Sequence, residues 1–200
     1  MRSLFSKHFH CLYIHVLLIL FLSSCVSKNT NIETENPQSR NIIKINCPFP
    51  IKQGVVYGKG ISKFDSTFIM FITKQLLFDL CEGHFSHLLG FVDAETGLFV
   101  DAKGYWSKQE VALDLKDPNG YFSLYYFDQK KLDLKKGNQG NLTIRDVFVQ
   151  AGPVVIDIYV GSKEEVELKF RFDSNPKLER YLINPSFIKT GNNWYLHRMF

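Results

Sequence analysis

Two patterns of apolar residues, which follow one another along the chain, constrain the fold most. From Asp65 to Gly83, apolar residues recur every three or four positions, which is the spacing of one helix face. From Val166 to Asp173, every second residue is apolar, which is typical of a strand with one face in the core and one in water. Helical segments come first and strand-like segments follow, so we expect an α+β fold.

Capping and stop residues divide the first half of this region into separate elements. The long helix is expected to be capped by Asp65 or Ser66 and to end before Gly83. Ser107 and Glu110 have the spacing of a capping box, which indicates another helix start. The shorter elements expected in this half are a helix over residues 84–90, a strand over 98–101 and the capped helix over 108–115.

The second half contains β-rich runs that are separated by turn residues. We expect strands over residues 121–128, 141–150, 153–161, 166–173, 182–189 and 194–200, and a short one over 42–45. The glycines of residues 53–62 do not match a nucleotide-binding fingerprint, so a loop is expected there. Together these elements predict N-terminal helices packed on the concave face of a strongly curved antiparallel sheet, a cone-like arrangement.

The N-terminus has the three regions of an export signal. A basic start precedes about twelve mostly apolar residues, and small residues follow them. The run Leu22–Cys25 resembles the lipobox of bacterial lipoproteins. The resemblance implies cleavage before Cys25 and attachment of acyl chains such as palmitate to that cysteine. An ordinary secretory signal or an uncleaved N-terminal anchor would also begin with basic and then apolar residues.

The chain therefore divides into three predicted parts. Residues 1–24 are the signal peptide, residues 25–41 are the lipidated cysteine and a flexible tether, and residues 42–200 form a single α+β domain. The tether is polar, so it cannot bury enough surface to order itself. Acyl chains on Cys25 would make the membrane a permanent partner. Val26 stands where some bacteria place an aspartate for inner-membrane retention, so the outer membrane is the preferred location.

The mature chain would be close to electrical balance. Arg2 and Lys7 leave with the signal, so 22 of the 24 basic residues remain against 20 acidic residues, a formal charge of +2. The densest basic pairs, Lys130-Lys131 and Lys135-Lys136, fit a solvated turn. Nucleic acid is therefore not expected as a partner.

Two of the four cysteines are candidates for a disulfide. Cys11 leaves with the predicted signal and Cys25 carries lipid, which leaves Cys47 and Cys81 in an oxidising compartment. A bridge would close a loop of about 35 residues, and two buried free thiols are the alternative, because both cysteines stand in apolar contexts. The sequence contains no Cys-x-x-Cys motif or Cys/His cluster, so we expect no metal and no cofactor.

Residues 83–111 and the closing segment 187–196, in which Gly191 precedes Trp194, carry a likeness to a known family. They are similar to the nuclear-transport-factor-2-like superfamily, which includes small polyketide cyclases and ketosteroid isomerase. The likeness covers about residues 64–200. It implies a cone-shaped fold in which helices and a curved sheet enclose a pocket.

The resemblance also implies candidate site residues. By position, Asp101 matches the pocket carboxylate with which the isomerases remove a proton next to a carbonyl. Asp157 would be a second inward acid, and Tyr125 or Tyr159 a phenol donor. The alternatives are a turn-capping carboxylate for Asp101 and exposure or a structural hydrogen bond for Asp157. The chain departs from the isomerase pattern, because Ala102 stands where the isomerases carry proline and the first helix lacks the donor tyrosine.

We therefore expect a lipid-anchored, non-catalytic binding or interaction module of the bacterial envelope, whose partner is a small apolar ligand or another envelope protein. The alternative is a small isomerase- or cyclase-like enzyme that uses Asp101 as a general base. The enzyme hypothesis requires Asp101 and Asp157 to converge inside an apolar pocket. The sequence leaves the oligomeric state open.

Overall fold

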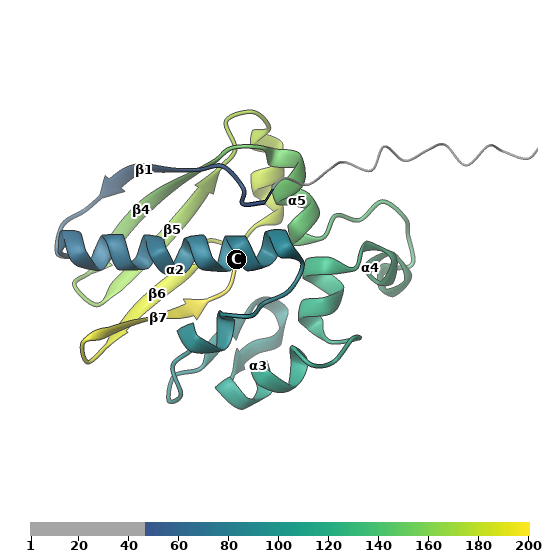
Figure 1. The fold of residues 1–200 in the computed structure, drawn as a ribbon, viewed down its shortest axis with the longest axis horizontal. Helices are drawn as coiled ribbons and strands as arrows, with labels where there is room; N and C mark the ends of the chain where they lie inside the picture. Colours follow the sequence, from purple (N-terminus) through teal and green to yellow (C-terminus); the bar gives the residue numbers. More distant parts are fainter. Residues whose placement is uncertain (1–46) are drawn as a thin grey trace, which may run out of the picture. The chain divides into compact units, whose positions relative to one another are not determined.

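The computed structural model describes residues 47–200. Within them the chain folds as an α+β domain with a mixed, open seven-stranded sheet (Figure 1). The predicted signal peptide, the lipidation site Cys25, the tether and the strand over 42–45 lie outside the described residues.

The sheet has the strand order β1-β4-β5-β6-β7-β2-β3. The strands are β1 (Ile51–Tyr57), β2 (Leu98–Val100), β3 (Gly104–Trp106), β4 (Val154–Ser162), β5 (Glu165–Arg171), β6 (Ser186–Thr190) and β7 (Asn193–Arg198). Strands β1 and β4 are parallel, and so are β2 and β7, which meet at Phe99 and Arg198. The other four neighbouring pairs are antiparallel, so the sheet is mixed, whereas the sequence indicated an antiparallel sheet.

Within residues 47–200, four α-helices and four shorter helical segments accompany the strands. The α-helices are α2 (Lys63–Glu82), α3 (Lys108–Asp114), α4 (Gln129–Lys136) and α5 (Ile144–Ala151), and the short segments are η1 (Leu88–Phe91), η2 (Asp101–Lys103), the π-helical η3 (Ser123–Phe127) and η4 (Pro176–Tyr181). Within residues 47–200, none of the helices combines the length and the apolarity that crossing a bilayer requires.

Several sequence predictions change in the structure. The segment 53–62 begins with most of strand β1, because its extended backbone pairs with β4 in spite of the glycines. The expected strand over 141–150 is mostly helix α5, which Thr143 and Asp146 cap reciprocally. The expected strand over 121–128 contains η3, and only the end of the segment 182–189 is a strand.

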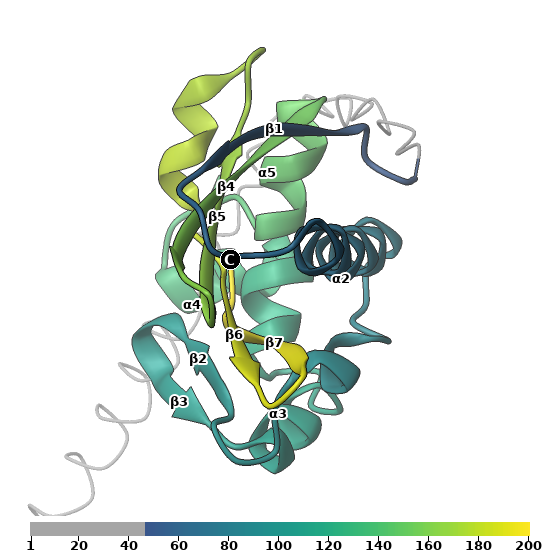
Figure 2. The same ribbon diagram turned by 90° about the vertical axis from the view of Figure 1, so that its left-hand side faces the viewer.

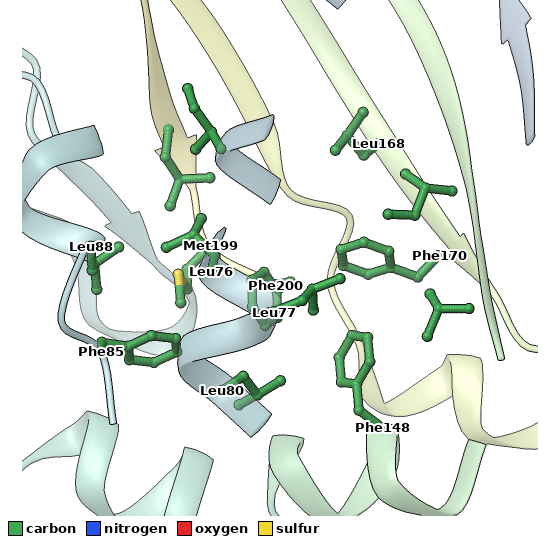
Figure 3. Close-up of a cluster of buried hydrophobic side chains, with 14 of the residues drawn as sticks. Leu76, Leu77, Leu80, Phe85, Leu88, Phe148, Leu168, Phe170, Met199 and Phe200 are labelled. Carbon is green, nitrogen blue, oxygen red and sulfur yellow. The ribbon is translucent and has the colours of Figure 1, made fainter. Parts of the chain in front are cut away.

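Helix α2 lies over one face of the sheet (Figures 1 and 2). Its inward residues Ile69, Ile72 and Leu76 are almost completely buried. They belong to one hydrophobic cluster with residues of α5, β5 and the segment after β7 (Figure 3). Phe148, Phe170 and Phe200 are three of its aromatic residues, and their ring centroids lie 5.4–5.8 Å apart. Burial of this cluster fixes the side of α2 that faces the sheet.

The N-terminus of α2 is tied to the β6–β7 hairpin. Ser62, rather than the expected Asp65 or Ser66, is the N-cap, and Asp65 completes a capping box with it. The Asp65 carboxylate also accepts hydrogen bonds from Trp194 Nε1 at 2.8 Å and from Lys189 Nζ at 3.2 Å. One carboxylate therefore caps the helix and joins it to the hairpin.

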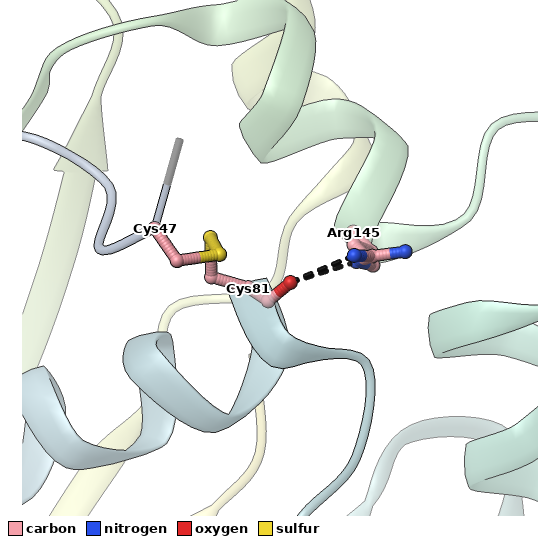
Figure 4. Close-up of a disulfide and its surroundings, with 3 residues drawn as sticks. All are labelled: Cys47, Cys81 and Arg145. Carbon is pink, nitrogen blue, oxygen red and sulfur yellow. Dashed lines mark hydrogen bonds between the residues drawn. A yellow bond between two sulfur atoms is a disulfide. The ribbon is translucent and has the colours of Figure 1, made fainter. Parts of the chain in front are cut away.

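The C-terminus of α2 is tied to the start of the described chain. Cys81 forms a disulfide with Cys47, as Figure 4 shows. The Cys81 carbonyl accepts hydrogen bonds from Arg145 Nε at 3.1 Å and Nη2 at 2.8 Å, which joins this end of α2 to α5. Gly83 then ends the helix with φ of 90°, a conformation that glycine adopts without steric cost.

Removal of the disulfide is expected to destabilise the domain. In the chain-entropy model, a bridge across a loop of about 35 residues contributes about 3–4 kcal/mol. The double variant Cys47→Ala, Cys81→Ala should lose that amount in urea denaturation followed by circular dichroism. Wild-type protein under reducing conditions is the matched control and should unfold like the variant. Equal midpoints for the oxidised wild type and the variant would contradict this role.

Asp65 is expected to make stability depend on pH in the acid range. Burial alone would raise its pKa, but hydrogen bonds from Trp194, Ser62 and Lys189 outweigh burial and lower the pKa from 3.8 to about 2. The stabilisation is therefore present above pH 4 and is lost as the pH falls through 2. We expect Asp65→Asn to remove about 2 kcal/mol of the difference in unfolding free energy between pH 5 and pH 2. An unchanged difference would refute the assignment.

Candidate functional site

A pocket of about 200 Å³ opens between the segment η2–η3, helix α4 and the segment η4. One acid, one lysine, four tyrosines and six apolar residues line it. These residues are Asp101, Lys136, Tyr121, Tyr125, Tyr126, Tyr181, Leu132, Leu142, Ile144, Ile183, Met199 and Phe200. This composition combines an apolar surface with one carboxylate, so the pocket is the best candidate for a binding site.

Three of the tyrosines, Tyr121, Tyr125 and Tyr126, reach the pocket because Asp114 holds the turn that precedes them. Its carboxylate accepts the backbone N–H of Tyr121 at 2.7 Å and that of Phe122 at 2.9 Å. Gly120 makes this close approach possible, because a Cβ there would lie 2.6 Å from the Asp114 carbonyl oxygen. The helical path that follows brings the rings of Tyr121 and Tyr125 to a centroid separation of 4.7 Å.

Two of the tyrosines are held in their neutral form. Burial raises the pKa of Tyr121, and the negative charge of Asp101 raises it further. Burial also raises the pKa of Tyr126 well above its ordinary value, and its hydroxyl donates a hydrogen bond to the carbonyl oxygen of Phe200. The Tyr126 hydroxyl is therefore already engaged within the protein.

Asp101 reaches the rim of the pocket from η2, directly after β2. Its side chain is exposed rather than enclosed. Asp101 and Tyr125, which the sequence analysis considered for one site, both line this pocket. Tyr159, the other predicted phenol, is placed elsewhere and stacks on Tyr57 with ring centroids 4.6 Å apart.

Asp157 is not part of this pocket. It lies on β4 and is 3% exposed, and its carboxylate accepts hydrogen bonds from Arg171 Nε at 2.7 Å and from the Val55 N–H at 2.8 Å. Burial would raise the pKa of Asp157, but these hydrogen bonds and the positive charge of Arg171 lower it. A Cβ at Gly54 would come within 2.0 Å of the carboxylate, so the glycine provides the space. Asp157 therefore joins β1, β4 and β5.

The two histidines that follow α2 have structural partners. His87 Nδ1 lies 2.7 Å from Asp79 Oδ1, and the His87 N–H donates to Asp79 Oδ2 at 2.7 Å. His84 Nδ1 lies 2.9 Å from the hydroxyl of Ser86. No group of three His, Cys, Asp or Glu side chains within residues 47–200 is arranged to hold a metal ion.

Sequence reasoning missed most of the pocket, because it assigned the tyrosine segment to a strand. Tyr121 and Tyr125 are four positions apart, and so are Phe122 and Tyr126. This spacing places each pair on the same side of a helical turn, so it was a signal that could have indicated the site. Lys136 and Tyr181 come from distant segments, and no local pattern places them near Asp101.

Comparison with known proteins found no matching family model, no similar curated protein and no similar solved structure. The chemistry of the pocket itself therefore carries the functional argument.

Proposed function

We propose that this protein is a lipid-anchored protein of the bacterial envelope whose domain binds a small ligand in the tyrosine pocket. The ligand has an apolar body and one protonated amine. The signal-like N-terminus and Cys25 support the anchor. The single observation that carries the binding function is the grouping of Asp101 with four tyrosines around an apolar pocket.

The residues that line the pocket are the reason why we propose a protonated amine on the ligand. Tyrosine ring faces attract organic cations through their quadrupoles, and a nearby carboxylate adds a direct charge interaction. Asp101 supplies that carboxylate, and Tyr121 and Tyr125 supply adjacent rings. Lys136 also lines the pocket, and its positive charge disfavours a second positive group on the ligand.

The size of the pocket limits the ligand. A volume of about 200 Å³ is below the range of about 300–1,000 Å³ that is usual for pockets that hold drug-sized molecules. A molecule with a single ring or a short branched chain fits this limit. Its apolar body would contact Leu142, Ile144 and Met199, and its amine would face Asp101.

The same geometry favours binding over catalysis. Proton abstraction by a carboxylate of the isomerase type depends on a pocket acid and a second group that stabilises the oxyanion. Here Asp101 is exposed, and Asp157 is engaged with Arg171 and Val55 at another place in the sheet. The two predicted acids therefore do not converge, and we propose a non-catalytic module.

The order of the elements supports the further proposal that the domain resembles the nuclear-transport-factor-2-like superfamily. A long helix α2 and a short segment η1 precede the hairpin β2–β3, helix α3 and the closing antiparallel strands β4–β7. A strongly curved sheet with helices on its concave face is part of this proposal. Strand β1 adds a parallel edge beside β4.

Isothermal titration calorimetry with three matched probes tests the binding function. Phenethylamine supplies the amine, propylbenzene is a neutral analogue of similar shape, and 3-phenylpropionate carries the opposite charge. We expect phenethylamine to bind best, and Asp101→Asn to weaken its binding by about threefold to fivefold, because the ion pair with the amine is lost while the tyrosine rings remain. The affinity for propylbenzene should change little.

Glu95→Gln is the control variant, because Glu95 is exposed and lies outside the pocket. It should bind phenethylamine like the wild type. If none of the probes binds, or if Asp101→Asn keeps the full affinity for phenethylamine, the proposed ligand class is incorrect.

A further inference from the structure

The outer face of α2 carries a row of phenylalanines, which we call the phenylalanine ridge: Phe64, Phe68, Phe71 and Phe78. Three of them are exposed, Phe64 by 77%, Phe71 by 52% and Phe78 by 38%. The ring of Phe68 lies 6.4 Å from that of Phe64 and 6.3 Å from that of Phe71. Spacings of four, three and seven residues place all four side chains along one side of the helix.

This helix is therefore apolar on two sides. Its inner side is buried in the hydrophobic cluster, whereas the outer side has no covering element among the described residues (Figure 2). Helices that are apolar all round occur in protein interiors or in lipid. A patch of exposed aromatic side chains of a few hundred Å² is often functional on a folded domain, so this side of α2 is a candidate interaction surface.

The length of chain between Cys25 and Cys47 limits how far the proposed lipid anchor lies from this ridge. Cys47 is bonded to Cys81, so the chain that leads back to Cys25 starts at the C-terminal end of α2 (Figure 4). Positions 25 and 47 are 22 residues apart, so the chain between them can span at most about 75 Å. A helix of 20 residues is itself about 30 Å long. An anchor at Cys25 therefore keeps the whole ridge within reach of the bilayer.

The charges on the same side of α2 fit a lipid surface. Lys63 and Lys74 are exposed beside the phenylalanines, and lysines in such positions can reach anionic headgroups while their stems stay in apolar contact. Asp65 is held by Trp194, and the buried Asp79 by His87. Glu82 is the exposed acid of α2 and lies at its last position.

The area of the ridge argues against a second copy of the chain as the occupant. The exposed fractions of the three rings add up to less than two phenylalanine side chains, on the order of 300 Å². A stable protein interface usually buries about 800 Å² on each partner. Contact with a bilayer requires no such minimum buried area, because the acyl chains already hold the protein at the membrane surface.

We infer that the phenylalanine ridge inserts into the interfacial region of the membrane that carries the lipid anchor, so that α2 lies along the bilayer surface. This inference rests on the proposed lipid anchor. It assigns the ridge a role that is separate from ligand binding in the tyrosine pocket.

Tryptophan fluorescence of the full-length acylated protein in vesicles tests the inference. The vesicles contain phosphatidylethanolamine and phosphatidylglycerol, with or without bromine on the acyl chains as a quencher. Phe71→Trp places a reporter on the ridge. Tyr105→Trp is the matched control, because Tyr105 is 60% exposed and pairs with Phe99 on the sheet face opposite the buried Leu98. Both variants keep Trp106 and Trp194 as the same background.

We expect the emission of Phe71→Trp to shift to shorter wavelength on vesicles and to lose most of its added intensity with brominated chains. The added emission of Tyr105→Trp should stay at long wavelength and unquenched. Equal quenching of both reporters, or quenching of neither, would overturn the inference. A blue shift without quenching, together with cross-linked dimers, would also overturn it and would identify a second copy as the occupant.

Vesicle flotation and mass spectrometry of Cys25 separate this outcome from failure of the anchor. If the protein floats and carries acyl chains but shows no quenching at position 71, the proposed anchor is supported and membrane insertion of the phenylalanine ridge is refuted. If the protein does not float and Cys25 is unmodified, both the lipid anchor and the insertion of the ridge are refuted.

Discussion

The position of helix α2 is the constraint on which the other features depend. Its N-terminus is held through Asp65 to the β6–β7 hairpin, and its C-terminus is held by the disulfide of Cys81 and by Arg145. The hydrophobic cluster fixes the rotation of the helix between these two ends. Because both ends and the rotation are fixed, the structure also determines which side of α2 faces outward.

The tyrosine pocket and the phenylalanine ridge, the two surfaces that we connect with function, are built by different parts of the domain. The tyrosine pocket is built by the segments between β2 and α5 together with η4, and it depends on the turn that Asp114 holds. The orientation of the outer side of α2 depends on the contacts at the two ends of the helix, which are the capping box at its N-terminus and the disulfide at its C-terminus. A ligand could therefore enter the pocket while the helix rests on a membrane.

Local signals in the sequence predicted the elements whose patterns were regular. The helical spacing in α2 and the alternation in β5 were both interpreted correctly. Helix α5 was missed although Thr143 and Asp146 have capping-box spacing, because its β-branched residues favoured a strand. The parallel pairing of β1 and the distance between Asp101 and Asp157 depend on long-range contacts, which a single sequence does not encode locally.

Amide hydrogen exchange of the oxidised protein, read by mass spectrometry, tests the central role of α2 most directly. If the clamped helix holds the domain together, its buried middle around Leu76 should exchange only by global unfolding and as slowly as β4 and β5. Exchange of the middle of α2 well ahead of those strands would show that the helix opens independently, and would contradict the account.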